Sequence, residues 1–176
     1  GAYERIYEQR RNPEYEEYFH AIENVLPPEE YVDWWIADNS IDYIRRHQND
    51  DQPFFLWCGF CSPHGPYDPP KPYSRLYEPA DMPLPLGYEQ LPEDVKPAPE
   101  KVQRAKAYYY GLVNFVDDMI GRLLDVLGET GVLDNTVVIY TTDHGDMLGD
   151  RGRFGKGNFL ENIINVPMVV RPPGGT

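Results

Sequence analysis

An aspartate, a histidine and a lysine lie close together in the last quarter of the chain, in a pattern that suits metal-assisted chemistry. Asp143 and His144 directly follow the apolar segment 136–140, and Lys156 lies between two glycines a little further on. Carboxylate oxygens bind hard divalent metals, imidazole nitrogens bind transition metals, and a lysine ammonium can bind an oxyanion. The combination predicts metal-assisted chemistry on an anionic ester.

Each of these residues also has a simpler interpretation. Asp143 could cap a loop, His144 could make an ordinary polar contact and Lys156 could be a solvated loop lysine. Adjacent residues in a strand point to opposite faces, so Asp143 and His144 can reach one ion only if the chain turns. Gly145 permits such a turn. The position of the pair at the end of an expected strand favours the metal site.

A second histidine lies in a rigid turn earlier in the chain. His64 stands between Pro63 and the pair Gly65-Pro66. A histidine held in this way is suited to donate a proton or hydrogen bond to an ester oxygen. The alternative is a surface histidine in a turn.

The composition indicates one globular α/β core. The chain has 176 residues, of which 41% are hydrophobic and 14% aromatic, and a net charge of −13. This charge argues against a nucleic-acid partner, and an anionic substrate would need a bound cation and local bases to overcome it. Arg151, Arg153 and Lys156 could supply these bases, or they could be solvated loop charges. No apolar run is long enough for a membrane span, and the first residues contain no signal-peptide pattern, so no compartment is assigned.

Hydrophobic periodicity and turn residues predict the following elements. The segment 63–99 carries eleven of the eighteen prolines, so we expect an ordered excursion of turns and extended pieces there. The first 26 residues have no clear periodicity. The expected elements are a helix at 29–48, a buried strand at 53–60, a long helix at 100–127, a strand at 136–142, a short helix at 159–164 and a strand at 166–171.

A strand, a long crossover helix and a second strand are typical of a parallel sheet with helices on both faces. Ligands of such sheets bind outside the carboxyl ends of the strands. His64 follows the first expected strand and Asp143-His144 follows the second. We therefore expect the two segments to meet at one edge of the sheet.

The two cysteines, Cys58 and Cys61, have the spacing of a thioredoxin-like redox pair. That chemistry requires the motif to open a helix, and the prolines that follow exclude one. Cys58 is better explained as a small buried hydrophobic residue. A zinc site built from Cys58, Cys61 and His64 lacks a fourth ligand.

From about Pro28 to Gly174 the chain resembles the middle part of a sulfatase, in the alkaline phosphatase superfamily. The resemblance implies an alkaline phosphatase-like α/β/α sandwich with a mostly parallel sheet, of which residues 1–176 form part of a single catalytic domain. It also implies hydrolysis of a small-molecule or carbohydrate sulfate ester. The segments that carry it are Pro-Phe-Phe-Leu at 53–56, Pro-His-Gly-Pro at 63–66, the helix at 109–127, Thr-Asp-His-Gly-Asp-Met-Leu-Gly-Asp at 142–150, Gly-Lys at 155–156 and Val-Pro at 166–167.

The resemblance also implies roles for individual residues. Asp143 and His144 correspond to the family's ligands of a divalent metal ion, calcium first and manganese as the alternative. His64 corresponds to the histidine that binds the ester, and Lys156 to the lysine that contacts the sulfate and the leaving group. Arg151 stands where many relatives have a histidine, and it receives no role.

One part of the family pattern is absent from the sequence. The family nucleophile is a formylglycine made from the first residue of a Cys/Ser-x-Pro-x-Arg segment, and Cys61-Ser62-Pro63-His64-Gly65 lacks the arginine. We therefore expect a fragment that lacks the nucleophile segment, the remaining metal ligands and the C-terminal subdomain, and that has no turnover alone. The alternatives to a sulfatase are a phosphonate monoester or phosphodiester hydrolase on the same scaffold and a non-catalytic binding module.

Overall fold

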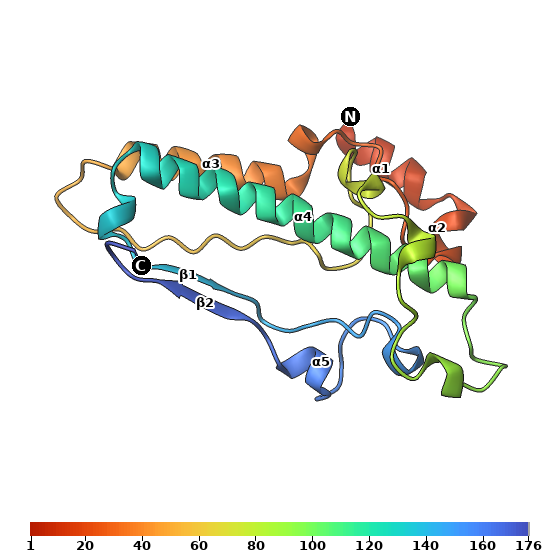
Figure 1. The fold of residues 1–176 in the computed structure, drawn as a ribbon. Helices are drawn as coiled ribbons and strands as arrows, with labels where there is room; N and C mark the ends of the chain where they lie inside the picture. The colour runs from red at the N-terminus through yellow and green to blue at the C-terminus, as the bar shows by residue number, and fades with distance from the viewer. Residues whose placement is uncertain (176) are drawn as a thin grey trace.

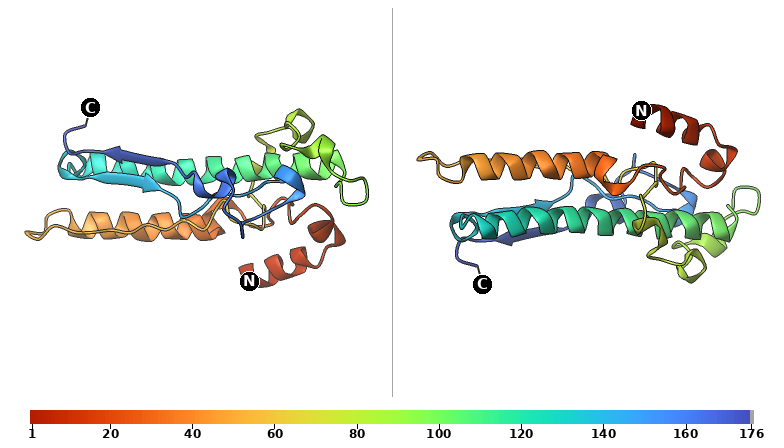
Figure 2. Two further views of the ribbon diagram at one scale, coloured as in Figure 1. Left: turned by 90° about the horizontal axis from the view of Figure 1, so that it is seen from below. Right: turned by 90° about the horizontal axis from the view of Figure 1, so that it is seen from above.

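Two long helices lie side by side and form one layer of the molecule, and the two strands lie on one side of this layer (Figures 1 and 2). The computed structural model describes residues 1–175. Helix α3 (Val32–His47) and helix α4 (Pro99–Glu129) make up the layer. Strands β1 (Val138–Thr141) and β2 (Met168–Arg171) follow, with the short helix α5 (Glu161–Ile164) between them.

The hydrophobic stripes of α3 and α4 form the core. Apolar residues recur at helical spacing on both helices, so each helix buries one face against the other. The predicted helices at 29–48 and 100–127 are thereby confirmed. Among the described residues, the buried hydrophobic residues form three clusters: one with Tyr31, Ala37, Leu112, Phe115 and Met119, a second with Ile41, Ile44, Val126 and Leu127, and a third with Ala21, Tyr67 and Ala105.

The segment 53–60 is extended but does not form a strand within the described residues, so the prediction of a buried strand is wrong. Phe54 and Leu56 pack against the core together with Val138 of β1. Phe55 and Trp57 are 85% and 78% exposed. This alternation arises because successive side chains of an extended chain point to opposite faces. The segment runs in the same direction as β1 (Figure 1).

The two strands of the described residues pair antiparallel, with Val138 opposite Arg171 and Thr141 opposite Met168. The parallel pair expected from the sequence was 53–60 with 136–142, and no direction was predicted for the strand at 166–171. Within residues 1–175 the segment 53–60 runs in the direction of β1 but forms no strand, so this pair is not present. A parallel pair needs a crossover connection that returns the chain to the starting end of the first strand. Here the loops and α5 between β1 and β2 return the chain from the end of β1, so the second strand runs backward (Figure 1).

Two helices at the beginning of the chain were not predicted from the sequence. Helix α1 (Ala2–Arg10) has no buried residue, so it lacks the apolar stripe on which a sequence-based assignment depends. Helix α2 (Pro13–Glu17) is a short helix whose N-cap residue, Asn12, accepts a hydrogen bond from the backbone N–H of Glu14.

The proline-rich segment 63–99 is folded against the helices. It forms three short 3₁₀ helices, at Tyr73–Arg75, Pro79–Asp81 and Tyr88–Gln90. Its start is fixed by Asp68, which is 4% exposed and accepts hydrogen bonds from Tyr31 (2.9 Å) and Asn24 (2.8 Å). The segment 1–31 and the proline-rich segment are thereby joined at one buried carboxyl group.

The buried carboxyl group of Asp68 predicts a pH dependence of stability. Burial raises its pKa to about 6, although hydrogen bonds from Tyr31 and Asn24 lower it. The unfolded chain releases this proton near pH 4, so between about pH 4 and pH 6 the folded state binds more protons. The contribution of this proton to the free energy of unfolding is fully present below pH 4 and is lost as the pH rises through 6. The total loss is at most about 3 kcal/mol. Urea unfolding of the full-length protein between pH 4 and pH 7 measures it.

The variant Asp68→Asn provides the comparison, because an amide does not titrate. We expect the wild-type protein to lose more stability than this variant between pH 4 and pH 6. Asp42→Asn, an exposed carboxylate on α3, is the control and should retain the wild-type slope. Equal slopes for wild type and Asp68→Asn would contradict the assignment.

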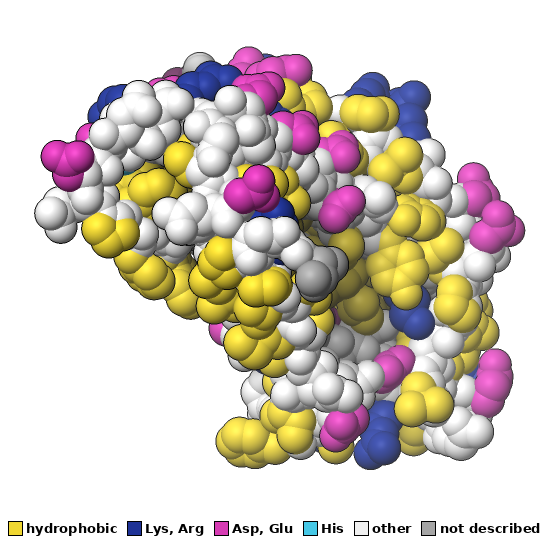
Figure 3. Space-filling model, turned by 60° about the vertical axis from the view of Figure 1, so that its left-hand side comes forward, with side chains coloured by type: hydrophobic (Ala, Val, Ile, Leu, Met, Phe, Trp, Pro, Cys, Tyr) yellow, Lys and Arg dark blue, Asp and Glu magenta, His cyan; other side chains and the backbone are white. Residues whose placement is uncertain are grey.

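Large hydrophobic side chains remain exposed on the strands and on the segment 53–60. Figure 3 shows that hydrophobic side chains gather on a hollowed face of the molecule. Contiguous exposed apolar surface of this kind is typical of an interface. Within residues 1–175, no helix is long and apolar enough to cross a membrane. The exposed residues include Phe55, Trp57, Ile139, Met168, Val169 and Val170.

Candidate active site

The turn of His64, the turn of Asp143 and His144, and the loop of Lys156 meet beyond the end of β1, although His64 is about 80 positions from Asp143 and His144. The rings of His64 and His144 have centroids 6.5 Å apart. The Nζ atom of Lys156 lies 2.6 Å from Nε2 of His144, and Oδ2 of Asp143 lies 3.5 Å from the same Nε2. The structure therefore brings together the four residues that the sequence singled out.

The hydrogen bonds of His144 determine its tautomer. Its Nδ1 lies 2.7 Å from the carbonyl oxygen of Gly145. A carbonyl oxygen only accepts, so Nδ1 carries the hydrogen, and an ammonium only donates, so Nε2 accepts from Lys156. The ring is therefore neutral, and its Nε2 lone pair points toward Lys156. A histidine that donates one ring N–H to a backbone carbonyl and presents the other nitrogen is typical of metal ligands.

Asp143 presents an ionised carboxylate beside this ring. Desolvation raises its pKa, but hydrogen bonds from the backbone N–H of His144 and from the hydroxyl of Thr142 lower it, so that the net effect is a lowered pKa. The N–H donates to Oδ1 at 2.9 Å, and the side chain is 82% exposed. The free oxygen of Asp143 and Nε2 of His144 face the same space.

His64 is oriented in the same way as His144. Its Nδ1 donates to the carbonyl oxygen of Gly65 at 2.7 Å, which leaves Nε2 free to interact with a ligand. The side chain is exposed. The rings of His64 and His144 are thus each oriented by the carbonyl oxygen of the glycine that follows.

Lys156 lies in a glycine-rich loop with open space around it. Gly155 and Gly157 have positive φ angles of 66° and 106°, and a Cβ atom added at either position would meet no atom within 4 Å. The loop can therefore bring its backbone close to a ligand. Arg151 and Arg153 are exposed in the preceding loop.

Gly145 is required by packing. A Cβ atom at this position would lie 1.8 Å from the carbonyl oxygen of Asn162, so every larger residue would displace the backbone. The N–H of Gly145 also donates to the carbonyl of Ile163 at 2.9 Å. Helix α5 is thereby held against the turn that carries His144.

A buried aspartate that the sequence analysis did not single out holds the turn of His64. Asp33 of α3 is fully buried. Its Oδ1 accepts from the backbone N–H groups of Cys61 (2.6 Å) and Ser62 (3.3 Å), and its Oδ2 accepts from the hydroxyl of Ser62 (2.5 Å). The sequence does contain a signal for this role, because Asp33 lies one turn before Ala37 on the apolar face of the predicted helix, where an aspartate is unusual.

Replacement of Asp33 should destabilise the protein strongly. Asp33→Ala leaves the two buried donors of Ser62 and the partly buried N–H of Cys61 facing a cavity, and each unsatisfied buried group costs about 1–3 kcal/mol. We expect the free energy of unfolding to fall by about 3 kcal/mol or more, measured by urea unfolding. Asp42→Ala, on the exposed side of the same helix, should change it by less than about 0.5 kcal/mol. A similar loss for both variants would contradict this role.

The donor set fits part of a divalent cation site. Asp143 supplies an anionic oxygen and His144 a neutral nitrogen, both of which suit a divalent ion. Among residues 1–175, no group of three or more His, Cys, Asp or Glu side chains is arranged to hold a metal ion. These two residues would therefore hold the ion together with ligands from elsewhere.

The cysteines are not arranged for redox chemistry. Both are free, and burial raises the pKa of each thiol. The sulfur of Cys58 accepts a hydrogen bond from the hydroxyl of Ser40 at 3.2 Å. The residues after Cys61 form turns rather than the first turn of a helix, as predicted. Cys58 is half-buried, so the prediction of a buried hydrophobic residue is confirmed only in part.

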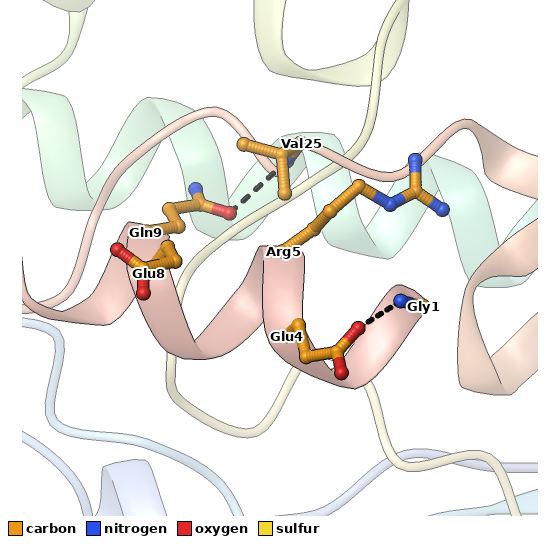
Figure 4. A pocket seen from close by; sticks show the side chains of 6 residues that line it. All are labelled: Gly1, Glu4, Arg5, Glu8, Gln9 and Val25. Atoms are coloured by element: carbon orange, nitrogen blue, oxygen red, sulfur yellow. Dashed lines mark hydrogen bonds and ion pairs between the residues drawn. The ribbon is translucent and has the colours of Figure 1, made fainter.

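A surface pocket beside α1 has no part in this site. It is lined by Gly1, Glu4, Arg5, Glu8, Gln9 and Val25 (Figure 4). The side-chain oxygen of Gln9 accepts a hydrogen bond from the backbone N–H of Val25, which holds α1 against the segment that contains Val25. None of the four candidate site residues lines the pocket.

The chain is similar to sulfatases and to phosphonate hydrolases. An arylsulfatase of Clostridium perfringens is 39% identical over 153 residues, which cover 80% of this chain and 32% of the relative. A choline-sulfatase of Rhizobium meliloti is 33% identical over 160 residues, which cover 80% and 31%. The structure of a phosphonate monoester hydrolase from Silicibacter pomeroyi superposes with a TM-score of 0.77 at 28% identity, covering 86% of this chain and 35% of the other.

The chain spans about a third of the length of these relatives. Its architecture is accordingly part of an alkaline phosphatase-like α/β domain, as the resemblance implied. The Sulfatase family model matches residues 1–176. The chain therefore belongs to the sulfatase family.

Proposed function

We propose that the full-length protein hydrolyses sulfate esters of small molecules or carbohydrates in a metal-dependent reaction. The observation that supports this most directly is the meeting of Asp143, His144, Lys156 and His64 around one open space. The similarity to an arylsulfatase and a choline-sulfatase indicates the sulfate ester class.

The four residues have two roles in the proposed reaction, binding of the ester and binding of the metal ion. Lys156 and His64 bind the anionic group, and the Lys156 ammonium balances the negative charge that develops on its oxygens. His64, once protonated, can donate from Nε2 to the leaving oxygen, because Nδ1 is engaged by Gly65. Asp143 and His144 would hold a divalent ion, calcium first and manganese as the alternative, which supplies further stabilisation of negative charge.

The nucleophile lies outside these residues in our proposal. The chain contains no Cys/Ser-x-Pro-x-Arg segment. We propose that a formylglycine from another part of the full-length protein attacks the ester, and that further ligands complete the metal site. The isolated chain should then bind anions weakly and show no turnover.

A phosphonate monoester hydrolase is the second candidate, because the structure from Silicibacter pomeroyi superposes well. The test compares kcat/KM of the full-length protein for an aryl sulfate and for the matching aryl phosphonate monoester. A preference for the sulfate supports the proposal, and a preference for the phosphonate supports the second candidate. Absence of turnover on both, in metal-loaded protein, would favour a non-catalytic module.

A further inference from the structure

The carboxylate of Asp146 joins three segments of the candidate site. Its Oδ1 accepts from the backbone N–H groups of Leu148 (2.9 Å) and Gly155 (3.0 Å), and its Oδ2 accepts from the hydroxyl of Tyr67 (2.9 Å). Hydrogen bonds to an ionised carboxylate are stronger than neutral ones. A single side chain thus links the turn at 146–148, the glycine-rich loop and the loop that follows the segment 53–60.

Each of these anchored positions lies close in sequence to a candidate site residue. Asp146 follows His144 by two positions, Gly155 directly precedes Lys156, and Tyr67 follows His64 by three positions. A second bond supports the link, because the N–H of Met147 donates to the carbonyl of Gly155 at 3.0 Å.

The tyrosine end of this link is rigid. Tyr67 is 5% exposed, and its ring packs edge-on against Tyr109 of α4 with centroids 5.9 Å apart. Ala21 and Ala105 complete the buried cluster. Burial and the neighbouring Asp146 raise the pKa of Tyr67, so its hydroxyl keeps the proton that it donates.

We propose that Asp146 and Tyr67 are a positioning pair that sets where His64 and Lys156 stand relative to His144. The expected effect on catalysis rests on the proposed sulfate ester hydrolysis. A misplacement of about 1 Å can cost about 100-fold in rate, although the misplaced groups still bind substrate. Loss of the pair should therefore lower kcat more than it raises KM.

The test uses the full-length protein with Tyr67→Phe, Asp146→Ala and the double variant. We expect each single change to lower kcat for an aryl sulfate about 10- to 100-fold with a smaller change in KM. The double variant should be little worse than the more damaging single one, because both remove the same link. Asp146→Asn should recover most of the activity, since its amide can accept from the two N–H groups and donate to the tyrosine oxygen.

The matched control is Tyr73→Phe. The Tyr73 hydroxyl donates to the carboxylate of Asp118 at 2.6 Å, which is the same kind of bond between the proline-rich segment and another part of the chain. This variant should keep the wild-type kcat. Tyr67→Phe with kcat within twofold of wild type, or additive effects in the double variant, would overturn the proposal.

A structural measurement separates this proposal from the proposed function. In a crystal structure of full-length Tyr67→Phe, we expect the centroid distance between His64 and His144 to depart from 6.5 Å or the His64 loop to show raised B-factors relative to wild type. This readout needs no turnover, so it tests the positioning pair even if no sulfate ester is hydrolysed. An unchanged and equally ordered pair of rings would overturn it.

Discussion

Lys156→Ala in the full-length protein should lower kcat for an aryl sulfate by about 100- to 1,000-fold, which is the range for loss of one group that stabilises developing negative charge. The Nζ atom is the only described cation within hydrogen-bond distance of His144, and the loop that carries it is open to a ligand. Because the charge on the ester oxygens grows toward the transition state, kcat should fall more than KM rises. Steady-state kinetics at saturating metal measures both values.

The control for this experiment is Lys106→Ala. Lys106 is a lysine of α4 whose ammonium donates to the carbonyl of Pro83, away from the site. The variant Lys106→Ala changes the net charge of the protein by the same amount as Lys156→Ala. Any general effect of net charge on the binding of an anionic substrate is therefore equal in the two variants. A kcat of Lys156→Ala close to that of Lys106→Ala would contradict the assigned role.

Asp143→Ala should abolish tight metal binding by the full-length protein. Loss of residues that only support a metal ligand costs about 10- to 100-fold in affinity, and loss of an anionic ligand should cost more than about 100-fold. Calorimetric titration of the metal-free protein with calcium and with manganese measures this directly and also identifies the preferred ion. The result does not depend on turnover.

Asp51→Ala is the matched control for the metal titration. Asp51 is an exposed aspartate in the loop before the segment 53–60, so its loss changes the net charge equally without touching the site. It should bind metal as the wild type does. Equal affinities for Asp143→Ala and wild type would remove Asp143 from the metal site.

The sequence predicts the long helices of this chain well, whereas the strand predicted at 53–60 does not form within the described residues. Helix α4 was predicted at 100–127 and runs over Pro99–Glu129. The prediction succeeds because a long apolar stripe at helical spacing, followed by glycines, is typical of a helix and of no other element. The antiparallel direction of β2 was not predicted, because it depends on how the connection folds and the loops between β1 and β2 have no periodic pattern. Helix α1 was missed because it buries no residue.

The candidate site was likewise predicted only in part from the sequence. His64 and Asp143-His144 each follow an extended segment, and the two segments run in the same direction, so their meeting was predicted by topology. Asp33 and the bond between Tyr67 and Asp146 were not predicted. These hydrogen bonds join positions far apart in the chain, so the partners of each residue cannot be read from one sequence, although the position of Asp33 on the buried face of α3 is a local signal for a buried polar group.

The central claim is that one metal ion and one ester are bound where Asp143, His144, Lys156 and His64 meet. The most direct test is a crystal structure of the full-length protein with calcium and a slowly hydrolysed sulfate ester. We expect calcium about 2.3–2.6 Å from an oxygen of Asp143, with Lys156 released from His144 onto a sulfate oxygen and His64 beside the ester. A metal ion and ester bound elsewhere, with Lys156 still donating to Nε2 of His144, would contradict the claim.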